Sequence, residues 1–231
     1  MSNTSRQLPL SLRYPPDQRL DAFVSAPVGA LMQLRELADD GQDWLYLSGP
    51  GDAGKTHLAL GFCAEAEARG YLTTYLPMSA LAGRVRDALP VPHQDMRIAL
   101  DGLECIARHR EDEVALFDFH NAARAAGAGV LYTAAEIPDA LGLALPDLRS
   151  RLSQLTRIQL KAADDSTRAA ILRLRAERRG LAMDEAAIDW LLKRVDRDLS
   201  SLTTLLERLD RESLAAQRRV TVPFLRQVLG G

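Results

Sequence analysis

The clearest chemical signature in the sequence is the run from Gly49 to Thr56, Gly-Pro-Gly-Asp-Ala-Gly-Lys-Thr. It matches the pattern G-x-x-x-x-G-K-[ST] at every fixed position. Glycines in such a loop let backbone N–H groups turn toward phosphate oxygens, and the helix that follows adds the positive end of its dipole. Lys55 is expected to reach the β- and γ-phosphates of a nucleotide, and the Thr56 hydroxyl to bind Mg²⁺. The alternative is a chance glycine-rich turn.

The predicted nucleotide site covers this loop and one residue beyond it. Its expected members are Gly49, Pro50, Gly51, Asp52, Ala53, Gly54, Lys55, Thr56 and His57. Asp52 does not fit this pattern easily, because a carboxylate inside the loop repels phosphate unless it faces solvent.

A magnesium site of this kind needs a second anchor, an acid at the end of a neighbouring strand. Asp101 follows the apolar run "RIAL" and is the candidate, with an ordinary turn aspartate as the alternative. Many ATPases place another acid directly afterwards to polarise the attacking water, but here that position is Gly102 and the next acid is Glu104. We therefore expect Thr56 and Asp101 to hold Mg²⁺ and intrinsic hydrolysis to be slow.

The elements that position these residues alternate between strands and helices. Short apolar runs predict strands at 44–48, 71–77, 96–101, 129–134 and 156–161. Helical patterns between them predict helices at 27–41, 55–69, 79–89, 111–126 and 147–152. This alternation implies right-handed crossovers and an α/β domain with a five-stranded parallel sheet.

Beyond this domain only helical patterns follow, from Asp164 to Leu229. Asp164 and Asp184 suit helix N-caps, Gly180 suits a helix end, and Pro223 suits a first helical turn. A small all-helical domain is therefore expected. The predicted division is a tail at 1–18, an α/β nucleotide-binding domain at 19–162 and a helical lid at 163–231. A basic cluster at 173–180 is interpreted as a solvated helix face.

Composition excludes several classes of protein. The chain has 231 residues, 47% hydrophobic and 26% charged, with a formal net charge of −2, which does not favour a duplex-DNA binder. No apolar run approaches the ~20 residues needed to span a bilayer, and no secretory signal opens the chain. The cysteines, Cys63 and Cys105, suit buried thiols in a reducing compartment. We expect a cytoplasmic protein without a membrane segment.

These motifs together resemble the AAA+ superfamily, and within it the DnaA-like family of the bacterial replication initiator DnaA and its short relatives of the Hda type. The resemblance rests on "GKTHL", "LDGLECIA", "LPDLRSRL" and the long run from Leu191 to Leu229, and it covers almost the whole chain. It implies an AAA+ P-loop domain with a helical lid that binds ADP or ATP with Mg²⁺. It also implies DnaA as partner and is compatible with a homodimer or higher homo-oligomer.

The resemblance also assigns roles to residues outside the loop. Thr133 takes the sensor-1 position near the γ-phosphate, and Arg197 takes the sensor-2 position in the lid. Arg151 matches the arginine finger that reaches a nucleotide in a neighbouring subunit. Arg149, two residues earlier in the same tract, is the alternative match to this finger. From the pattern alone, each arginine reads as a surface ion pair.

The N-terminal segment carries a second resemblance. Gln7, Leu8, Leu10 and Leu12 stand in "QLPLSL", which is similar to the Q-L-x-L-x-L peptides that bind the bacterial sliding clamp, the β subunit of DNA polymerase III. An extended, proline-stiffened peptide can present leucines to an apolar pocket at a low ordering cost. The alternative is an ordinary tail.

The implied function is negative regulation of replication initiation, in which Arg151 stimulates hydrolysis of ATP bound to DnaA. DnaA carries a DNA-binding domain beyond its lid, whereas this sequence ends at Gly231, so we expect no direct sequence-specific DNA binding. One alternative is a DnaC-type helicase loader, which binds helicase and single-stranded DNA. Another is a self-sufficient P-loop enzyme such as a small kinase.

Overall fold

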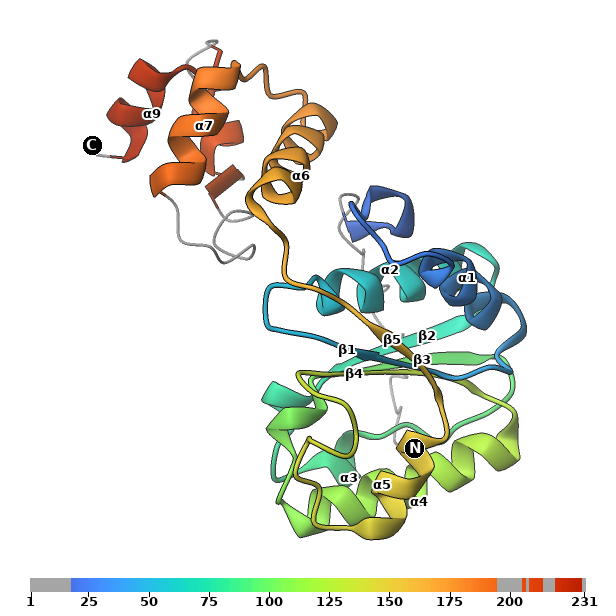
Figure 1. The fold of residues 1–231 in the computed structure, drawn as a ribbon. Coiled ribbons are helices and arrows are strands. Elements are labelled where there is room, and N and C mark those ends of the chain that lie inside the picture. Colours follow the sequence, from blue (N-terminus) through green and yellow to red (C-terminus); the bar gives the residue numbers. More distant parts are fainter. Residues whose placement is uncertain (1–17, 195–204, 207, 214–218, 230–231) are drawn as a thin grey trace, which may run out of the picture.

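The computed structural model describes residues 18–194, 205–206, 208–213 and 219–229 (Figure 1). Gln7, Leu8, Leu10 and Leu12 of the predicted clamp motif lie outside these residues, as does Arg197. In the described part of the chain, each helix is too short or too polar to cross a bilayer.

A five-stranded parallel sheet forms the centre of the larger domain, in the order β2-β3-β4-β1-β5. The strands are β1 Leu45–Ser48, β2 Leu72–Pro77, β3 Met96–Asp101, β4 Gly129–Ala134 and β5 Thr156–Gln159. Every residue of β1, β3 and β4 is buried, whereas the edge strands β2 and β5 are partly exposed. The predicted α/β fold with five parallel strands is confirmed.

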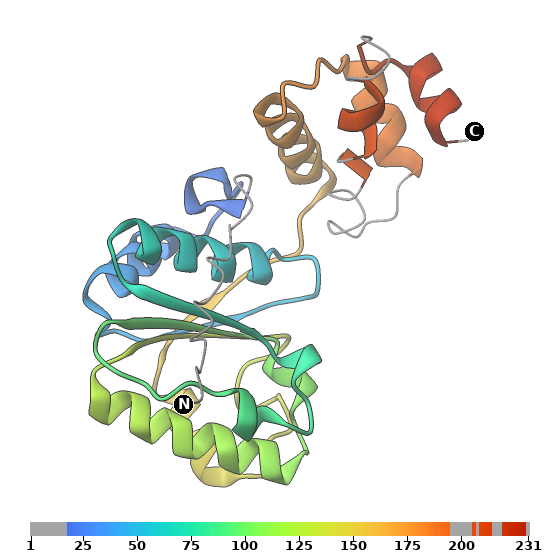
Figure 2. The ribbon, with the colours of Figure 1, turned by 180° about the vertical axis from the view of Figure 1, so that it is seen from behind.

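Helices cover both faces of this sheet (Figures 1 and 2). On one face lie α1 Ala30–Asp40 and α2 Lys55–Ala68, and on the other lie α3 Val85–Ala88, α4 Arg110–Ala126 and α5 Pro146–Ser153. Short 3-10 turns at Leu20–Ala22, Met78–Ala80 and Leu103–Cys105 complete the domain. Because the strands are parallel, their carboxyl ends meet at one edge, where the loops after β1 and β3 lie together.

The predicted helix at 79–89 is wrong in extent. The chain forms a 3-10 turn at Met78–Ala80 and then the four-residue α3, with Gly83 between them at φ 82°. The carboxylate of Asp112, on α4, accepts hydrogen bonds from the backbone N–H of Gly83 at 2.6 Å and of Val85 at 3.2 Å. This contact from a distant helix fixes the break, and the local pattern does not reveal it.

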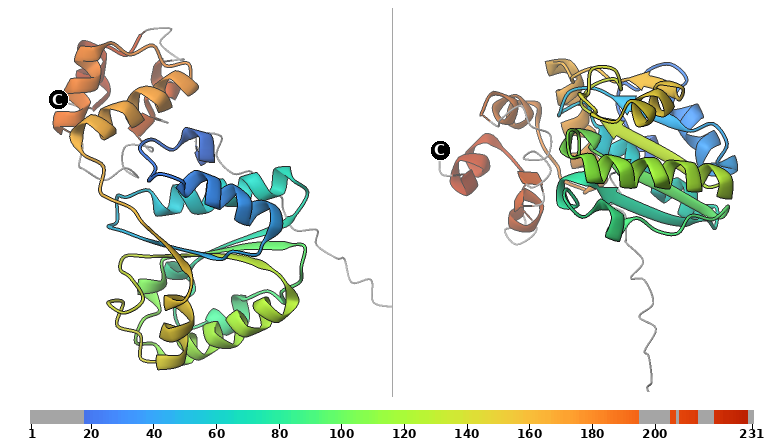
Figure 3. Two further views of the ribbon diagram at one scale, coloured as in Figure 1. Left: turned by 45° about the vertical axis from the view of Figure 1, so that its right-hand side comes forward. Right: turned by 90° about the horizontal axis from the view of Figure 1, so that it is seen from below.

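The C-terminal residues form a separate helical unit, joined to β5 by the segment 160–164 (Figure 3). It contains α6 Asp165–Arg178, α7 Glu185–Arg194 and α9 Val222–Leu229. Asp164 caps α6 by accepting from the Thr167 N–H at 2.7 Å, and Asp184 accepts from the Ala187 N–H at 2.7 Å, as predicted. This unit, called the lid below, buries its own core: Leu172, Ile188, Leu191, Leu206, Leu209, Val220 and Leu225.

Candidate nucleotide-binding site

The loop between β1 and α2 has the shape that its glycines predict. Gly54 adopts φ +85°, and a Cβ built there would lie 2.6 Å from a ring carbon of Phe23. A Cβ on Gly49 would lie 2.7 Å from the carbonyl oxygen of Leu160. Side chains at these two positions would therefore collide with their neighbours. The loop ends directly at Lys55, so the N-terminus of α2 opens onto it.

The Lys55 ammonium lies against the loop itself. Its Nζ donates to the carbonyl oxygens of Gly49 at 2.6 Å and Pro50 at 2.8 Å, and the residue is only 6% exposed. The loop backbone thus holds the charge beside the helix N-terminus, where an anion would meet both. Contact between Lys55 and the β- and γ-phosphates remains a prediction.

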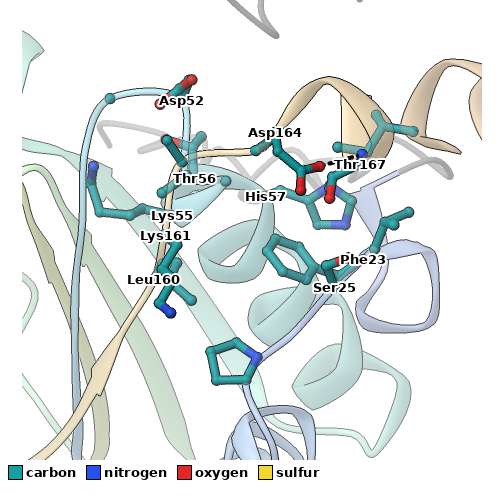
Figure 4. A pocket seen from close by; sticks show the side chains of 18 of the residues that line it. Phe23, Ser25, Asp52, Lys55, Thr56, His57, Leu160, Lys161, Asp164 and Thr167 are labelled. Atoms are coloured by element: carbon teal, nitrogen blue, oxygen red, sulfur yellow. Dashed lines mark hydrogen bonds between the residues drawn. The ribbon is translucent and has the colours of Figure 1, made fainter. Parts of the chain in front are cut away.

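A cavity of about 640 Å³ opens beside the loop (Figure 4). Of the predicted loop residues, those from Gly51 to His57 line it, whereas Gly49 and Pro50 serve as acceptors for Lys55. Asp52 is half-buried and stands at the outer tip of the loop in Figure 4, apart from Lys55. This placement lessens the repulsion that a carboxylate would exert on phosphate.

One wall of the cavity comes from the N-terminal segment 18–27, for which the sequence suggested no such role. The ring nitrogen Nε2 of His57 lies 2.9 Å from the backbone oxygen of Arg19, and the ring packs edge-to-face on Phe23 with centroids 5.3 Å apart. His57 thus fixes this segment against the start of α2. The side chains of Phe23 and Val24 give the wall an apolar surface suited to a base.

A further part of the cavity lining comes from the linker and the lid helix α6. Thr167, Ile171 and Arg175 follow one another at a spacing of four and line the cavity together. Arg175 is 7% exposed, so the interpretation of 173–180 as a solvated helix face is wrong at this residue. Arg173 fits that interpretation, because it is exposed and pairs with Glu185 at 2.5 Å. Their i, i+4 spacing places the three residues on one face of α6, but no local pattern in the sequence shows what that face covers.

The second predicted anchor, Asp101, lies beside Thr56. The Thr56 hydroxyl donates to Oδ2 of Asp101 at 2.8 Å, and the Tyr75 hydroxyl donates to the same oxygen at 2.7 Å. The hydroxyl of Thr133 donates to Oδ1. Burial, and then the Asp101 charge, raises the pKa of Tyr75, so its hydroxyl stays protonated and acts as a donor. The sequence predicted Thr56 and Asp101 but not Tyr75.

Thr133 is fully buried and does not line the cavity. Its hydroxyl donates a hydrogen bond to Asp101, and the hydroxyl oxygen accepts one from the Gly102 N–H at 3.0 Å. In this arrangement Thr133 supports the Asp101 carboxylate, and the sensor-1 role stays a prediction.

Glu104 lies near this site, and one of its two carboxylate oxygens is engaged by the backbone. Its Oε2 accepts from the backbone N–H of Ala135 at 2.9 Å, just beyond the end of β4. Gly102, which stands where a second acid is expected, adopts φ +87° and precedes the 3-10 turn Leu103–Cys105, and a Cβ built on it would lie 3.9 Å from Oε1 of Glu104.

The oxygen donors at this edge suit Mg²⁺ only together with phosphate. Mg²⁺ prefers one or two carboxylates, several waters and the oxygens of a bound nucleotide. Thr56 provides one hydroxyl and Asp101 one carboxylate, and the two are joined by a hydrogen bond. Among the described residues, no group of three or more acidic, cysteine or histidine side chains could hold a metal without further ligands. These residues fit a metal that arrives with its nucleotide.

Arg151 lies outside the cavity, on α5. Its side chain is exposed and forms no hydrogen bond or ion pair with any residue that the structure describes. Arg149, on the same helix, is exposed as well. Arg151 belongs to α5, and α5 covers the sheet face opposite α2, the helix that follows the phosphate loop (Figure 1).

Comparison with known families identifies the lid. Residues 165–229 match the Hda lid domain. The match spans α6, α7 and α9, the helices that pack around the lid core.

Comparison with solved structures identifies the fold. Domain III of the replication initiation protein DnaA from Thermotoga maritima superposes with a TM-score of 0.76 at 18% identity, covering 94% of this chain and 97% of that one. DnaA from Aquifex aeolicus bound to AMPPCP gives a TM-score of 0.66 at 19% identity, covering 84% and 65%. A RuvB variant from Thermotoga maritima gives 0.67 at 18%, covering 94% and 72%. The chain therefore has an AAA+ fold with an Hda-type lid.

Proposed function

We propose that this Hda/DnaA-like AAA+ protein binds ADP or ATP with Mg²⁺ between its phosphate loop and its lid, and acts as a negative regulator of replication initiation. The observation that carries the nucleotide site is the pairing of Thr56 with Asp101 beside a cradle closed by Lys55. A DnaA of similar fold is described with AMPPCP, an ATP analogue, which supports an adenine nucleotide here.

We infer that the protein hydrolyses its own nucleotide slowly. Gly102 follows Asp101 directly, and Glu104 is held by the backbone of Ala135. The position directly after Asp101 therefore supplies no carboxylate to polarise a water, and Glu104, the next acid, has one of its two oxygens engaged by the Ala135 N–H. The nucleotide would act as a scaffold that fixes the lid against the α/β domain, because both line the cavity.

The proposed catalytic contribution is made in trans. Phosphoryl transfer spreads negative charge over the equatorial oxygens, and a guanidinium supplied by a neighbouring protein can be worth ~10³–10⁵ in rate. Arg151 is exposed and without a hydrogen bond or ion pair among the described residues, as a residue donated to a partner must be. We propose that it contacts ATP held by DnaA, returning DnaA to its ADP form.

The nucleotide site is tested by replacing the lysine. Lys55→Ala removes the cradle's cation, and we expect affinity for a fluorescent ADP to fall by about 100-fold, because hydrogen bonds to charged groups are worth about 1.5 to 3 kcal/mol each. Lys193→Ala removes an exposed lysine of the lid helix α7 and serves as the control, with unchanged affinity. Equal affinity of the Lys55 variant and the wild type would contradict the proposed site.

The clamp interaction rests on the sequence of residues 7–12, which lie outside the described part of the chain. We propose that Gln7, Leu8, Leu10 and Leu12 dock on the DNA polymerase III sliding clamp and so place the protein on replicated DNA in the cytoplasm. Gln7→Ala is expected to abolish capture of the purified clamp while leaving ADP affinity unchanged. Undiminished capture by this variant would refute the docking role.

A further inference from the structure

We propose that Tyr75 is a positioning residue for the magnesium-dependent part of nucleotide binding, acting through Asp101. This inference rests on the nucleotide and Mg²⁺ site proposed above. The Tyr75 hydroxyl would hold the Asp101 carboxylate in the orientation that faces Thr56, so that the metal–nucleotide complex meets a ligand already in place.

The register of the sheet brings the two residues together. β2 and β3 are parallel, with Tyr75 opposite Ala99 and Pro77 opposite Asp101. Tyr75 is therefore two residues before Pro77, the residue paired with Asp101. Because alternate residues of a strand share a face, Tyr75 lies on the same face of the sheet as Pro77. The phenol ring spans this offset, and its hydroxyl lies 2.7 Å from Oδ2 of Asp101.

The hydrogen bonds at Asp101 divide into two roles. Thr56 belongs to the phosphate loop, and its hydroxyl is the predicted metal ligand. Tyr75 and Thr133 do not line the cavity, and they hold the two carboxylate oxygens from opposite ends, Oδ2 and Oδ1. A carboxylate held at both oxygens cannot rotate freely, which lowers the cost of arranging it for a metal.

Removing the Tyr75 hydroxyl should leave Oδ2 with Thr56 alone. When Mg²⁺ binds, the Thr56 hydroxyl must also serve the metal, so the carboxylate would then lose its fixed orientation. The backbone N–H groups of the loop and Lys55 do not contact Tyr75 through any hydrogen bond in the described residues. The metal-independent part of nucleotide binding should therefore not change.

The test is the Mg²⁺ dependence of ADP affinity in Tyr75→Phe. Binding of a fluorescent ADP is measured in EDTA and across a Mg²⁺ titration. We expect the Mg²⁺ concentration at half-effect to rise roughly tenfold, the size expected for one lost hydrogen bond to a charged group. Affinity in EDTA should stay within about twofold of the wild type, because the lost contact touches only Asp101.

Tyr46→Phe is the matched control. It also removes a hydroxyl from a tyrosine of the sheet, but that hydroxyl donates to the backbone oxygen of Glu136 at 2.9 Å. Its Mg²⁺ midpoint should equal that of the wild type. Thermal unfolding of both variants checks that each one folds.

A second experiment separates positioning from a general loss of structure. In an Asp101→Asn background, the further change Tyr75→Phe should leave the Mg²⁺ midpoint where Asp101→Asn alone puts it, because the two residues act through one carboxylate. Additive effects would overturn the inference, as would an unchanged midpoint in Tyr75→Phe or an equal loss of affinity in EDTA. A wild-type protein whose ADP affinity ignores Mg²⁺ would overturn the proposed metal site and this inference with it.

Discussion

At the scale of single residues, the site is defined by how its polar groups are paired. Motif spacing was enough to predict Lys55, Thr56 and Asp101, because phosphate and Mg²⁺ chemistry requires those residue types at those places. Tyr75 could not be predicted in this way. It reads as an ordinary strand residue, and its hydrogen bond depends on the register between β2 and β3, which no local pattern specifies.

His120 carries a prediction of its own at this scale. The ring lies between Trp44 and Tyr132, with Nδ1 at 3.1 Å from the Tyr132 hydroxyl, and is 3% exposed. Burial, helped by the positive charges of Arg124 and Arg151, lowers its pKa from 6.5 to about 4. The folded protein therefore keeps His120 neutral at pH values where the unfolded chain already binds a proton.

The stability that follows is fully present above pH 6.5 and is lost as the pH falls toward 4, because only the unfolded state takes up the proton in that window. Between pH 7 and pH 5 the wild type should lose roughly 2 kcal/mol more free energy of unfolding than His120→Gln, which has no imidazole to titrate. Urea unfolding at the two pH values measures this difference. An identical pH dependence of the two proteins would contradict it.

At the scale of elements, the central strands β1, β3 and β4 were predictable because each is a short apolar run that is buried at every residue. Gly41 follows α1 and Gly127 follows α4, both at positive φ, so the ends of these helices were marked in the sequence as well. The helix expected at 79–89 failed because Asp112, on another element, supplies the hydrogen bonds that end the turn and start α3.

The walls of the cavity, too, could be predicted from the sequence only in part. The phosphate loop is one continuous segment and was predicted as such. The segment 18–27 and the helix α6 reach the cavity only through tertiary packing. His57 illustrates this, because the sequence placed it beside the nucleotide, whereas its ring also holds the backbone of Arg19. A motif specifies the residues that contact phosphate, and the fold determines what surrounds them.

At the scale of the whole molecule, the cavity and Arg151 belong to opposite sides of the central sheet. The nucleotide cavity lies between the α2 face and the lid, whereas Arg151 lies on α5, which covers the other face. This separation agrees with the proposed role of Arg151 in trans, which stays a prediction. An Hda-type lid on a DnaA-like fold supports DnaA as the partner in that role.

The central claim is that Arg151 acts on ATP bound to DnaA, and its test compares two arginines of α5. Hydrolysis of DnaA-bound ATP is measured in a single turnover on DNA loaded with the sliding clamp. Wild type and Arg149→Ala should accelerate it, whereas Arg151→Ala should give at least a ~10³-fold smaller rate increase while still binding clamp and ADP. Full acceleration by Arg151→Ala would contradict the account, as would a loss confined to Arg149→Ala.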